Sequence, residues 1–315
     1  MSAAIPQHKL LESPNSRSIE VNGWFITAST NPISNAPECD ALQASLGIPL
    51  PEMTFGNNYL TLGHRPSGFK YSFSTHEALK AVKKGELVDG DGGVKVGHAE
   101  KWMQSRTDPY SSLPMPKTVP TKPYDWTYTT TYSGHSESEL ESSTLPSELS
   151  GIPWTAADPE DPSHAIPLAE LSRPDPILFY AEIPLFEDEL HDNGSSSVIV
   201  RIRIMPTCLF ILSRFTLRVD HVLFRTYDTR VYHSFNSSPP LILREKGGWE
   251  APYERVQRHL PRRDDMTPLT DPTFIGKFLT ELPKHISQRE GAKTGWRGLG
   301  SKTEVAVLTE KTTVT

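Results

Sequence analysis

The longest regular pattern of hydrophobic and polar positions lies between residues 177 and 235 and predicts a series of β-strands. Within residues 198–205, Val200, Ile202 and Ile204 are apolar and the two residues between them are arginines. Such alternation is typical of a strand with one buried face. Parallel neighbours need a crossover of about a dozen residues or more, so strands joined as tightly as these must be antiparallel. The other strands predicted in this run are residues 177–186, 209–219 and 222–233.

Turn residues and helix caps mark the elements outside this run. Residues 35–46 predict a helix with Pro37 in its first turn and an end at Gly47, a residue able to take the left-handed cap conformation. Ser74 followed by Glu77 is a capping box at the start of a second helix. Further helices are expected at 99–103 and 271–282, and further strands at 19–26, 59–62, 69–73 and 124–132. The predicted fold class is α+β: a mainly antiparallel β-sheet domain with a few short flanking helices and long polar insertions.

Low-complexity segments set the expected domain limits. We predict a single domain over residues 19–286, preceded by a disordered N-terminus at 1–18 and followed by a disordered tail at 287–315. Pro-rich or Ser/Glu-rich stretches without sustained periodicity are typical of insertions. The expected insertions are residues 107–121, 133–176 and 236–270.

Composition and charge exclude several classes of protein. Only 36% of the 315 residues are hydrophobic, 28 are proline, and the net charge is −6. An acidic chain lacks the basic face that nucleic-acid binding requires, so we expect no nucleic-acid partner. The longest apolar run, residues 208–212, is too short to cross a bilayer, so we expect no membrane partner. Cys39 and Cys208 fall in a predicted helix and strand and are expected to be reduced. We expect a protein of the cytoplasm, with the nucleus as a second compartment.

The chain contains none of the common catalytic motifs. It has no phosphate-binding Gly-rich loop, no dinucleotide-binding glycine pattern, no nucleophile elbow and no zinc-binding His-Glu-x-x-His helix. The two cysteines cannot build a Cys-rich zinc site. We therefore expect a protein that is not an enzyme and needs no cofactor.

One enzymatic alternative stays open. Aspartates and histidines cluster near predicted strand ends, where they would bind a metal or act as acid and base if the strands brought them together. More often, such residues cap exposed backbone groups in turns. The set is Asp188, His191, Asp192, Asp220, His221, Asp228 and His233.

Five segments, in order along the chain, resemble the TIP-forty-one-like family of phosphatase regulators. They are PEMTFGNN at 51–58, KPYDWTYTT at 122–130, LFEDELHD at 185–192, VRIRIMP at 200–206 and DTRVYH at 228–233. Each is long and compositionally unusual, so agreement of all five by chance is improbable. We expect a fungal member of the family.

The resemblance implies a non-catalytic regulator that binds the catalytic subunit of type 2A-family phosphatases. It further implies a link to TOR signalling through a Tap-type phosphatase-associated protein. The family fold has a cleft that receives the C-terminal tail of the phosphatase. Positions that match the family's phosphatase-facing residues are Glu77, Ile166, Thr226 and Asp228. Two of them depart from the animal proteins, which have Asp in place of Glu77 and Met in place of Thr226.

We expect this cleft to lie between the capped helix and the late strands. Replacing Asp228 with Leu is then expected to weaken binding while leaving the thermal midpoint near that of the wild type. The acidic segment containing Glu187, Asp188 and Asp192 has two interpretations. It either protects a strand edge from unwanted pairing or meets a basic surface of the partner.

A signalling scaffold is the remaining alternative. In that interpretation the Pro-rich and acidic loops recruit other domains, because extended proline segments lose little entropy when they dock. Deletion of residues 107–121 separates the two functions, since phosphatase binding should survive it.

Overall fold

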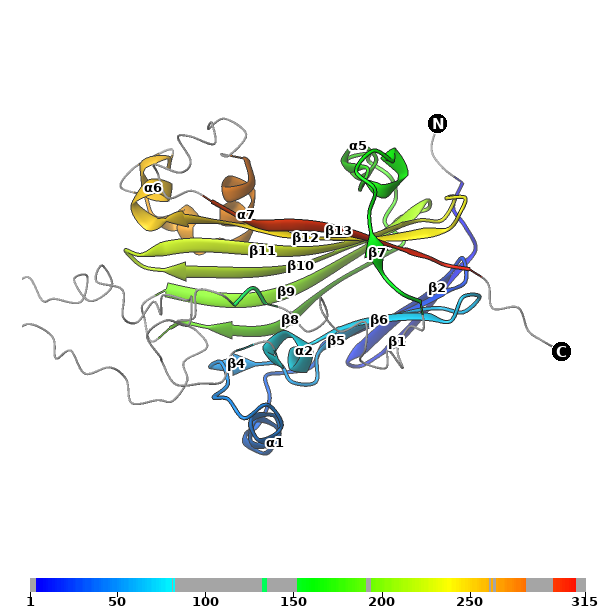
Figure 1. Cartoon of the computed structure of the whole chain (residues 1–315). Helices are drawn as coiled ribbons and strands as arrows, with labels where there is room; N and C mark the ends of the chain where they lie inside the picture. The colour runs from blue at the N-terminus through cyan, green and yellow to red at the C-terminus, as the bar shows by residue number, and fades with distance from the viewer. Residues whose placement is uncertain are drawn as a thin grey trace, which may run out of the picture.

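The computed structural model describes residues 4–80, 82, 132–134, 152–190, 194–260, 262, 265–281 and 297–309. Two antiparallel sheets form its framework (Figure 1). The smaller sheet has the strand order β1 (His8–Ser13), β2 (Ser16–Val21), β3 (Trp24–Ser29), β5 (Tyr59–His64) and β6 (Phe69–Ser74). The larger sheet has the order β4 (Met53–Thr54), β8 (Phe179–Asp188), β9 (Gly194–Ile204), β10 (Cys208–Val219), β11 (Leu223–Ser234), β12 (Leu241–Pro252), β13 (Arg297–Val307) and β7 (Thr155–Ala156).

The large sheet has two faces that we name by what covers them. The inner face packs against the small sheet, α1 (Ala36–Leu46) and α2 (Thr75–Lys80). The outer face carries α5 (Leu168–Leu171) near one end, and α6 (Tyr253–Arg258), η4 (Thr267–Thr270) and α7 (Pro272–Glu281) at the other (Figure 1). The short helix η3 (Pro162–His164) precedes α5. The main hydrophobic core lies between the sheets, and two smaller clusters lie under the outer helices.

The α+β fold class is confirmed, as are the caps of two helices and the alternating strand at 198–205, whereas residues 19–26, expected as one strand, form the turn and flanking parts of the β2–β3 hairpin. In α1, the Asn35 side chain accepts from the Glu38 N–H at 3.1 Å and the Glu38 carboxylate accepts from the Asn35 N–H at 2.9 Å. Gly47 ends the helix with φ 65°. The Glu77 N–H donates to the Ser74 hydroxyl at 3.3 Å, which confirms one half of the second capping box. Val200, Ile202 and Ile204 are buried on the inner face as their alternation predicted.

Three predictions about disordered or loop-like segments were wrong. Residues 8–21, expected to begin as a disordered N-terminus, form the β1–β2 hairpin. Residues 297–307, expected to be a disordered tail, form β13. Residues 241–252, expected to belong to a loop-like insertion, form β12 between β11 and β13.

The physical reason is that pairing between distant segments stabilises these strands despite their weak hydrophobic patterns. On the inner face of β12, Arg244 pairs with Glu304 of β13 at 2.7 Å and the Arg244 guanidinium lies 4.2 Å from the Trp154 ring centroid. Arg225 of β11 forms a buried ion pair with Glu250 of β12. Charged residues therefore occupy inner positions where alternation would require apolar ones.

Several predicted segments lie outside the described residues. These are the helix at 99–103, the insertion at 107–121 and most of the strand at 124–132. Of the expected insertion at 133–176, the described part contains β7, η3 and α5. Among the helices of the described ranges, none combines the length and apolarity needed to cross a membrane.

Candidate functional site

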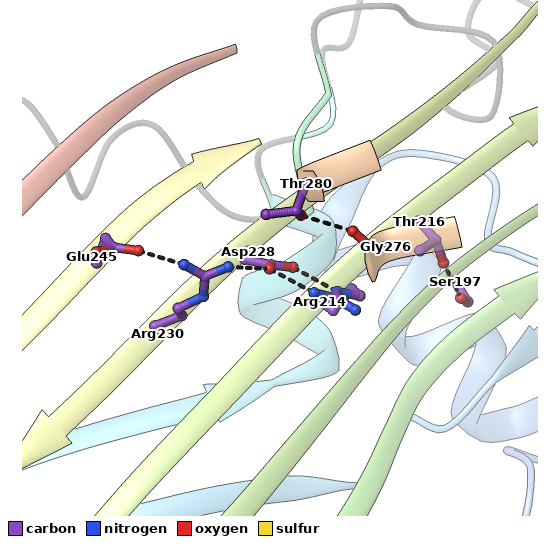
Figure 2. A network of polar contacts seen from close by, with 8 residues as sticks. All are labelled: Ser197, Arg214, Thr216, Asp228, Arg230, Glu245, Gly276 and Thr280. Atoms are coloured by element: carbon purple, nitrogen blue, oxygen red, sulfur yellow. Dashed lines mark hydrogen bonds and ion pairs between the residues drawn. The ribbon is translucent and has the colours of Figure 1, made fainter. Parts of the chain in front are cut away.

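A network of charged side chains lies in the middle of the outer face (Figure 2). Successive side chains of a strand point to opposite faces, so Thr226, Asp228 and Arg230 of β11 share the outer face. The Asp228 carboxylate accepts two hydrogen bonds from Arg214 of β10, at 2.7 Å from Nε and 2.8 Å from Nη2. Arg230 donates to the same carboxylate at 3.0 Å and to Glu245 of β12 at 2.6 Å. The network thus joins three neighbouring strands.

The Arg214–Asp228 pair is buried, whereas the other end of the network is open. The side chains of Arg214 and Asp228 are 12% and 9% exposed, against 26% and 33% for Arg230 and Glu245. Burial by itself would lower the pKa of Arg214, but the hydrogen bonds to Asp228 and its negative charge outweigh that effect and raise the pKa. Arg214 is therefore held in its charged form, and the bidentate geometry fixes the orientation of Asp228.

Helix α7 packs directly on Arg214. A Cβ atom added to Gly276 would lie 2.2 Å from Arg214 Nη1, far inside van der Waals contact. Arg218, on the same face of β10, donates to the Leu269 carbonyl oxygen at 3.0 Å and so holds η4. Only glycine allows α7 to approach this closely, because the guanidinium is already held in place by Asp228.

Beside the network, the outer face is hollowed into a groove of about 280 Å³. Glycines of β12 and β13 create the hollow, since they place no side chains on the sheet surface. The register shifts between Gly247 and Trp249, and a Cβ atom on Gly248 would lie 2.3 Å from the Thr226 carbonyl oxygen. The groove is lined by Thr226, Asp228, Arg230, Glu245, Lys246, Gly247, Gly248, Trp249, Thr280, Gly298, Gly300 and Ser301.

The groove has the chemistry of a binding surface. Arg230 and Glu245 supply partly exposed donors and acceptors, Trp249 supplies an aromatic wall, and the glycines leave room above the sheet. An extended polypeptide can use all three features, because its backbone and alternate side chains need hydrogen bonds and shallow pockets.

The structure separates the predicted site residues into two groups. Thr226 and Asp228 line the groove together. Ile166, 9% exposed, belongs to the apolar cluster on the same outer face, near α5. Glu77 instead lines a cavity of about 30 Å³ with Ser213 and Thr229, on the inner face. The expected single cleft between the capped helix and the late strands therefore does not contain Asp228, because the large sheet lies between them.

The acidic segment at the end of β8 is partly structural. The Asp188 carboxylate is buried and accepts from the backbone N–H groups of Leu190 at 2.7 Å and Glu52 at 3.2 Å. Burial, and then the negative charge of Glu182, raise the pKa of the half-buried Glu187. Asp192 lies outside the described residues. Asp188 thus holds the backbone at Leu190 and Glu52, whether or not Glu187 and Asp192 contact a partner.

Of the aspartates and histidines considered for metal binding, those that the structure describes do not come together. Asp220 and His221 lie in the β10–β11 turn, and Asp228 pairs with arginines in mid-strand. At the far end of β11, the His233 Nδ1–H donates to the Leu241 carbonyl oxygen at 2.7 Å. His191 and Asp192 fall outside the described ranges. Within those ranges, no three His, Cys, Asp or Glu residues are grouped in a way that could hold a metal ion.

The main residues that sequence reasoning missed are the partners of Asp228. Arg214 lies directly opposite Asp228 in the β10–β11 hairpin, and Glu245 lies opposite Arg230 in the β11–β12 hairpin. The first pairing could have been found from a correct count of the turn residues. The second required β12 to be recognised as a strand.

Comparison with known proteins gives consistent matches over most of the chain. A model of the TIP41-like family matches residues 53–257. The TIP41-like protein of Homo sapiens is 38% identical over 257 residues, which cover 81% of this chain and 83% of that protein. The type 2A phosphatase activator TIP41 of Saccharomyces cerevisiae is 34% identical over 250 residues, covering 76% and 64%. Its namesake in Schizosaccharomyces pombe is 32% identical over 249 residues, covering 79% and 87%.

Proposed function

Because the chain belongs to the TIP41-like family, we propose that it binds the catalytic subunit of a type 2A protein phosphatase and regulates it without catalysing a reaction itself. Support comes from the two yeast relatives, which are named type 2A phosphatase activators. A link to TOR signalling through a Tap-type partner, in the cytoplasm and the nucleus, belongs to the same proposal.

The observation that carries the proposal is the outer-face groove. Thr226 and Asp228, which the family resemblance marks as phosphatase-facing, line one hollow. In the proposed complex, the extended C-terminal tail of the phosphatase lies in this groove. Its backbone lies over the glycines of β12 and β13, its charged groups meet Arg230 and Glu245, and an apolar side chain packs on Trp249. Specificity then comes from the charges at the groove margin and from its depth.

Calorimetric titration with a purified type 2A catalytic subunit tests this proposal. We expect submicromolar binding that weakens when the last residues of the subunit are removed. Ser301 is exposed in β13 and lines the groove, so Ser301→Tyr should fill it and weaken binding at least about tenfold, equivalent to about 1.4 kcal/mol. Ser301→Ala is the matched control and should bind like the wild type.

Two further results test the location of the binding site and the binding function separately. Glu77→Ala changes the inner face only, so it should leave the dissociation constant within about twofold if the groove is the site. A loss of binding in Glu77→Ala with none in Ser301→Tyr would move the site to the inner face. If neither the full-length nor the truncated subunit binds, the proposed function is wrong for this chain.

A further inference from the structure

The outer edge of the small sheet differs from the other sheet edges of the described residues. The large sheet ends in the two-residue strands β4 and β7, which pair with only two residues each of β8 and β13. β6 is mostly half-buried, and its Tyr71 contacts Trp154 and Arg244. β1 has six residues, and every one of them is exposed. Among the four strands that end the two described sheets, it is the one longer than two residues in which every residue is exposed.

β1 also exposes apolar side chains. Leu10 is 47% and Leu11 is 39% exposed, and Ile5 just before the strand is 59% exposed. Because neighbouring residues of a strand point to opposite faces, both faces of β1 carry an exposed leucine. Exposed leucines on an open edge favour pairing with another strand.

The backbone directions along β1 follow from the hairpins. The Thr30 N–H donates to the Asn15 carbonyl at 2.9 Å, so odd-numbered residues of β2 direct their hydrogen bonds to β3. The two kinds of residue pair alternate in an antiparallel ladder, so the even-numbered residues of β2 bond to β1. Their partners are Lys9, Leu11 and Ser13. His8, Leu10 and Glu12 therefore direct their N–H and C=O groups away from the sheet.

We propose that β1 is a self-association edge, at which two copies of this chain pair their β1 strands in antiparallel fashion. With a twofold axis perpendicular to the sheet, the same face of both copies lies on the same side. Residues directly opposite each other then have their side chains on the same face, so an even-numbered residue must lie opposite an even-numbered one. In the register centred on Leu10, each His8 faces Glu12 of the other copy, and each Lys9 faces Leu11.

This register is complementary in both charge and shape. His8 and Glu12 have opposite charges when the histidine is protonated, and the pair occurs twice. The Lys9 stem covers Leu11 of the other copy while its ammonium group stays in water. Glu12 remains available, because its ion pair with Arg17 at 3.3 Å is formed by side chains that are 68% and 52% exposed. Pairing of six residues buries a small area, so we expect a weak, concentration-dependent dimer.

Sedimentation velocity of the full chain over a range of concentrations tests the association. The wild type and Leu10→Val should shift reversibly from monomer to dimer as concentration rises. Leu10→Pro removes one outward N–H and leaves the hydrogen bonds to β2 in place, so it should stay monomeric with a thermal midpoint close to that of Leu10→Val. Dimerisation of Leu10→Pro like that of the wild type would overturn the assignment of the interface.

Disulfide trapping tests the register. Opposite residues of a hydrogen-bonded pair have Cα atoms about 5.5 Å apart, within the range that a disulfide spans. In a Cys39→Ser background, in which the remaining Cys208 is buried, Leu10→Cys should form a covalent dimer under mild oxidation. Leu11→Cys, which faces Lys9, should not. Stronger cross-linking of Leu11→Cys would overturn the register, and a monomer at every concentration without cross-linking would overturn the proposal.

Discussion

Replacement of Asp228 with leucine removes one partner of a buried ion pair and should strongly destabilise the protein. Arg214, 12% exposed in its side chain, would keep its charge but lose two hydrogen bonds of 2.7 and 2.8 Å. Arg230 would lose a third bond of 3.0 Å. Breaking a buried pair by removing one partner typically costs about 3–5 kcal/mol, because the remaining charge is left uncompensated in a poorly solvated site. Both side chains are well under a third exposed, so solvent screening does not reduce this estimate much.

Denaturant unfolding of the wild type, Asp228→Leu, Arg214→Met and the double variant measures this effect as a double-mutant cycle. Asp228→Leu should lower the free energy of unfolding by about 3–5 kcal/mol, and Arg214→Met in addition should restore part of the loss by removing the unpaired charge. Glu182→Leu is the matched control. It breaks an ion pair on the same face, with Arg201 at 2.6 Å, in which the glutamate is 44% exposed. That exposed pair should contribute less than about 1 kcal/mol.

Equal effects of Asp228→Leu and Glu182→Leu, or a double variant less stable than Asp228→Leu alone, would show that no uncompensated buried charge remains at Arg214. The expected loss of stability replaces the sequence-based expectation that Asp228→Leu leaves the thermal midpoint unchanged. That expectation treated Asp228 as a surface contact, whereas its carboxylate is 9% exposed.

Two further predictions concern packing and pH. Gly276→Ala should lower the free energy of unfolding by about 1–3 kcal/mol, because its Cβ would meet the Arg214 guanidinium at 2.2 Å. The loss is expected although alanine normally favours a helix. Thermal unfolding of Gly276→Ala with and without Arg214→Met measures how much of the loss depends on that contact. Burial lowers the pKa of His233 to about 4. The contribution of the neutral His233 side chain to the free energy of unfolding is therefore fully present above about pH 6.5. It declines by about 1.4 kcal/mol per pH unit as the pH falls toward 4. Urea unfolding between pH 7 and pH 4.5 should show this decline, and it should be absent in His233→Gln.

The parts of the fold encoded by neighbouring residues could be predicted from the sequence. Asn35, Glu38 and Gly47 set both ends of α1, and each signal lies within one turn of the helix end it determines. β13 carries no comparable local signal, because four of its residues from 297 to 302 are Gly, Ser or Lys. It forms a strand because β12 supplies hydrogen bonds and because Glu304 pairs with Arg244. No window of neighbouring residues contains that information.

The candidate site shows how a single residue in a turn decides a prediction. A two-residue turn at Asp220 and His221 would pair Val219 with Val222 and shift every later pair in the hairpin by one. The structure has three residues between the paired Val219 and Leu223, with His221 at φ 62°. Only this count brings Arg214 opposite Asp228, because a slip of one residue moves a side chain to the other face of the sheet.

The position of the network also decides which substitution tests phosphatase binding. Asp228 faces the groove, but the same carboxylate holds Arg214, on which α7 packs through Gly276. A change at Asp228 therefore affects the groove, the sheet and the helix together, and a loss of binding there would not distinguish a lost contact from a displaced α7. Ser301 lines the groove from the opposite side, on an exposed stretch of β13. Binding measured with Ser301→Tyr thus reports on occupancy of the groove, and stability measured with Asp228→Leu reports on the network beneath it.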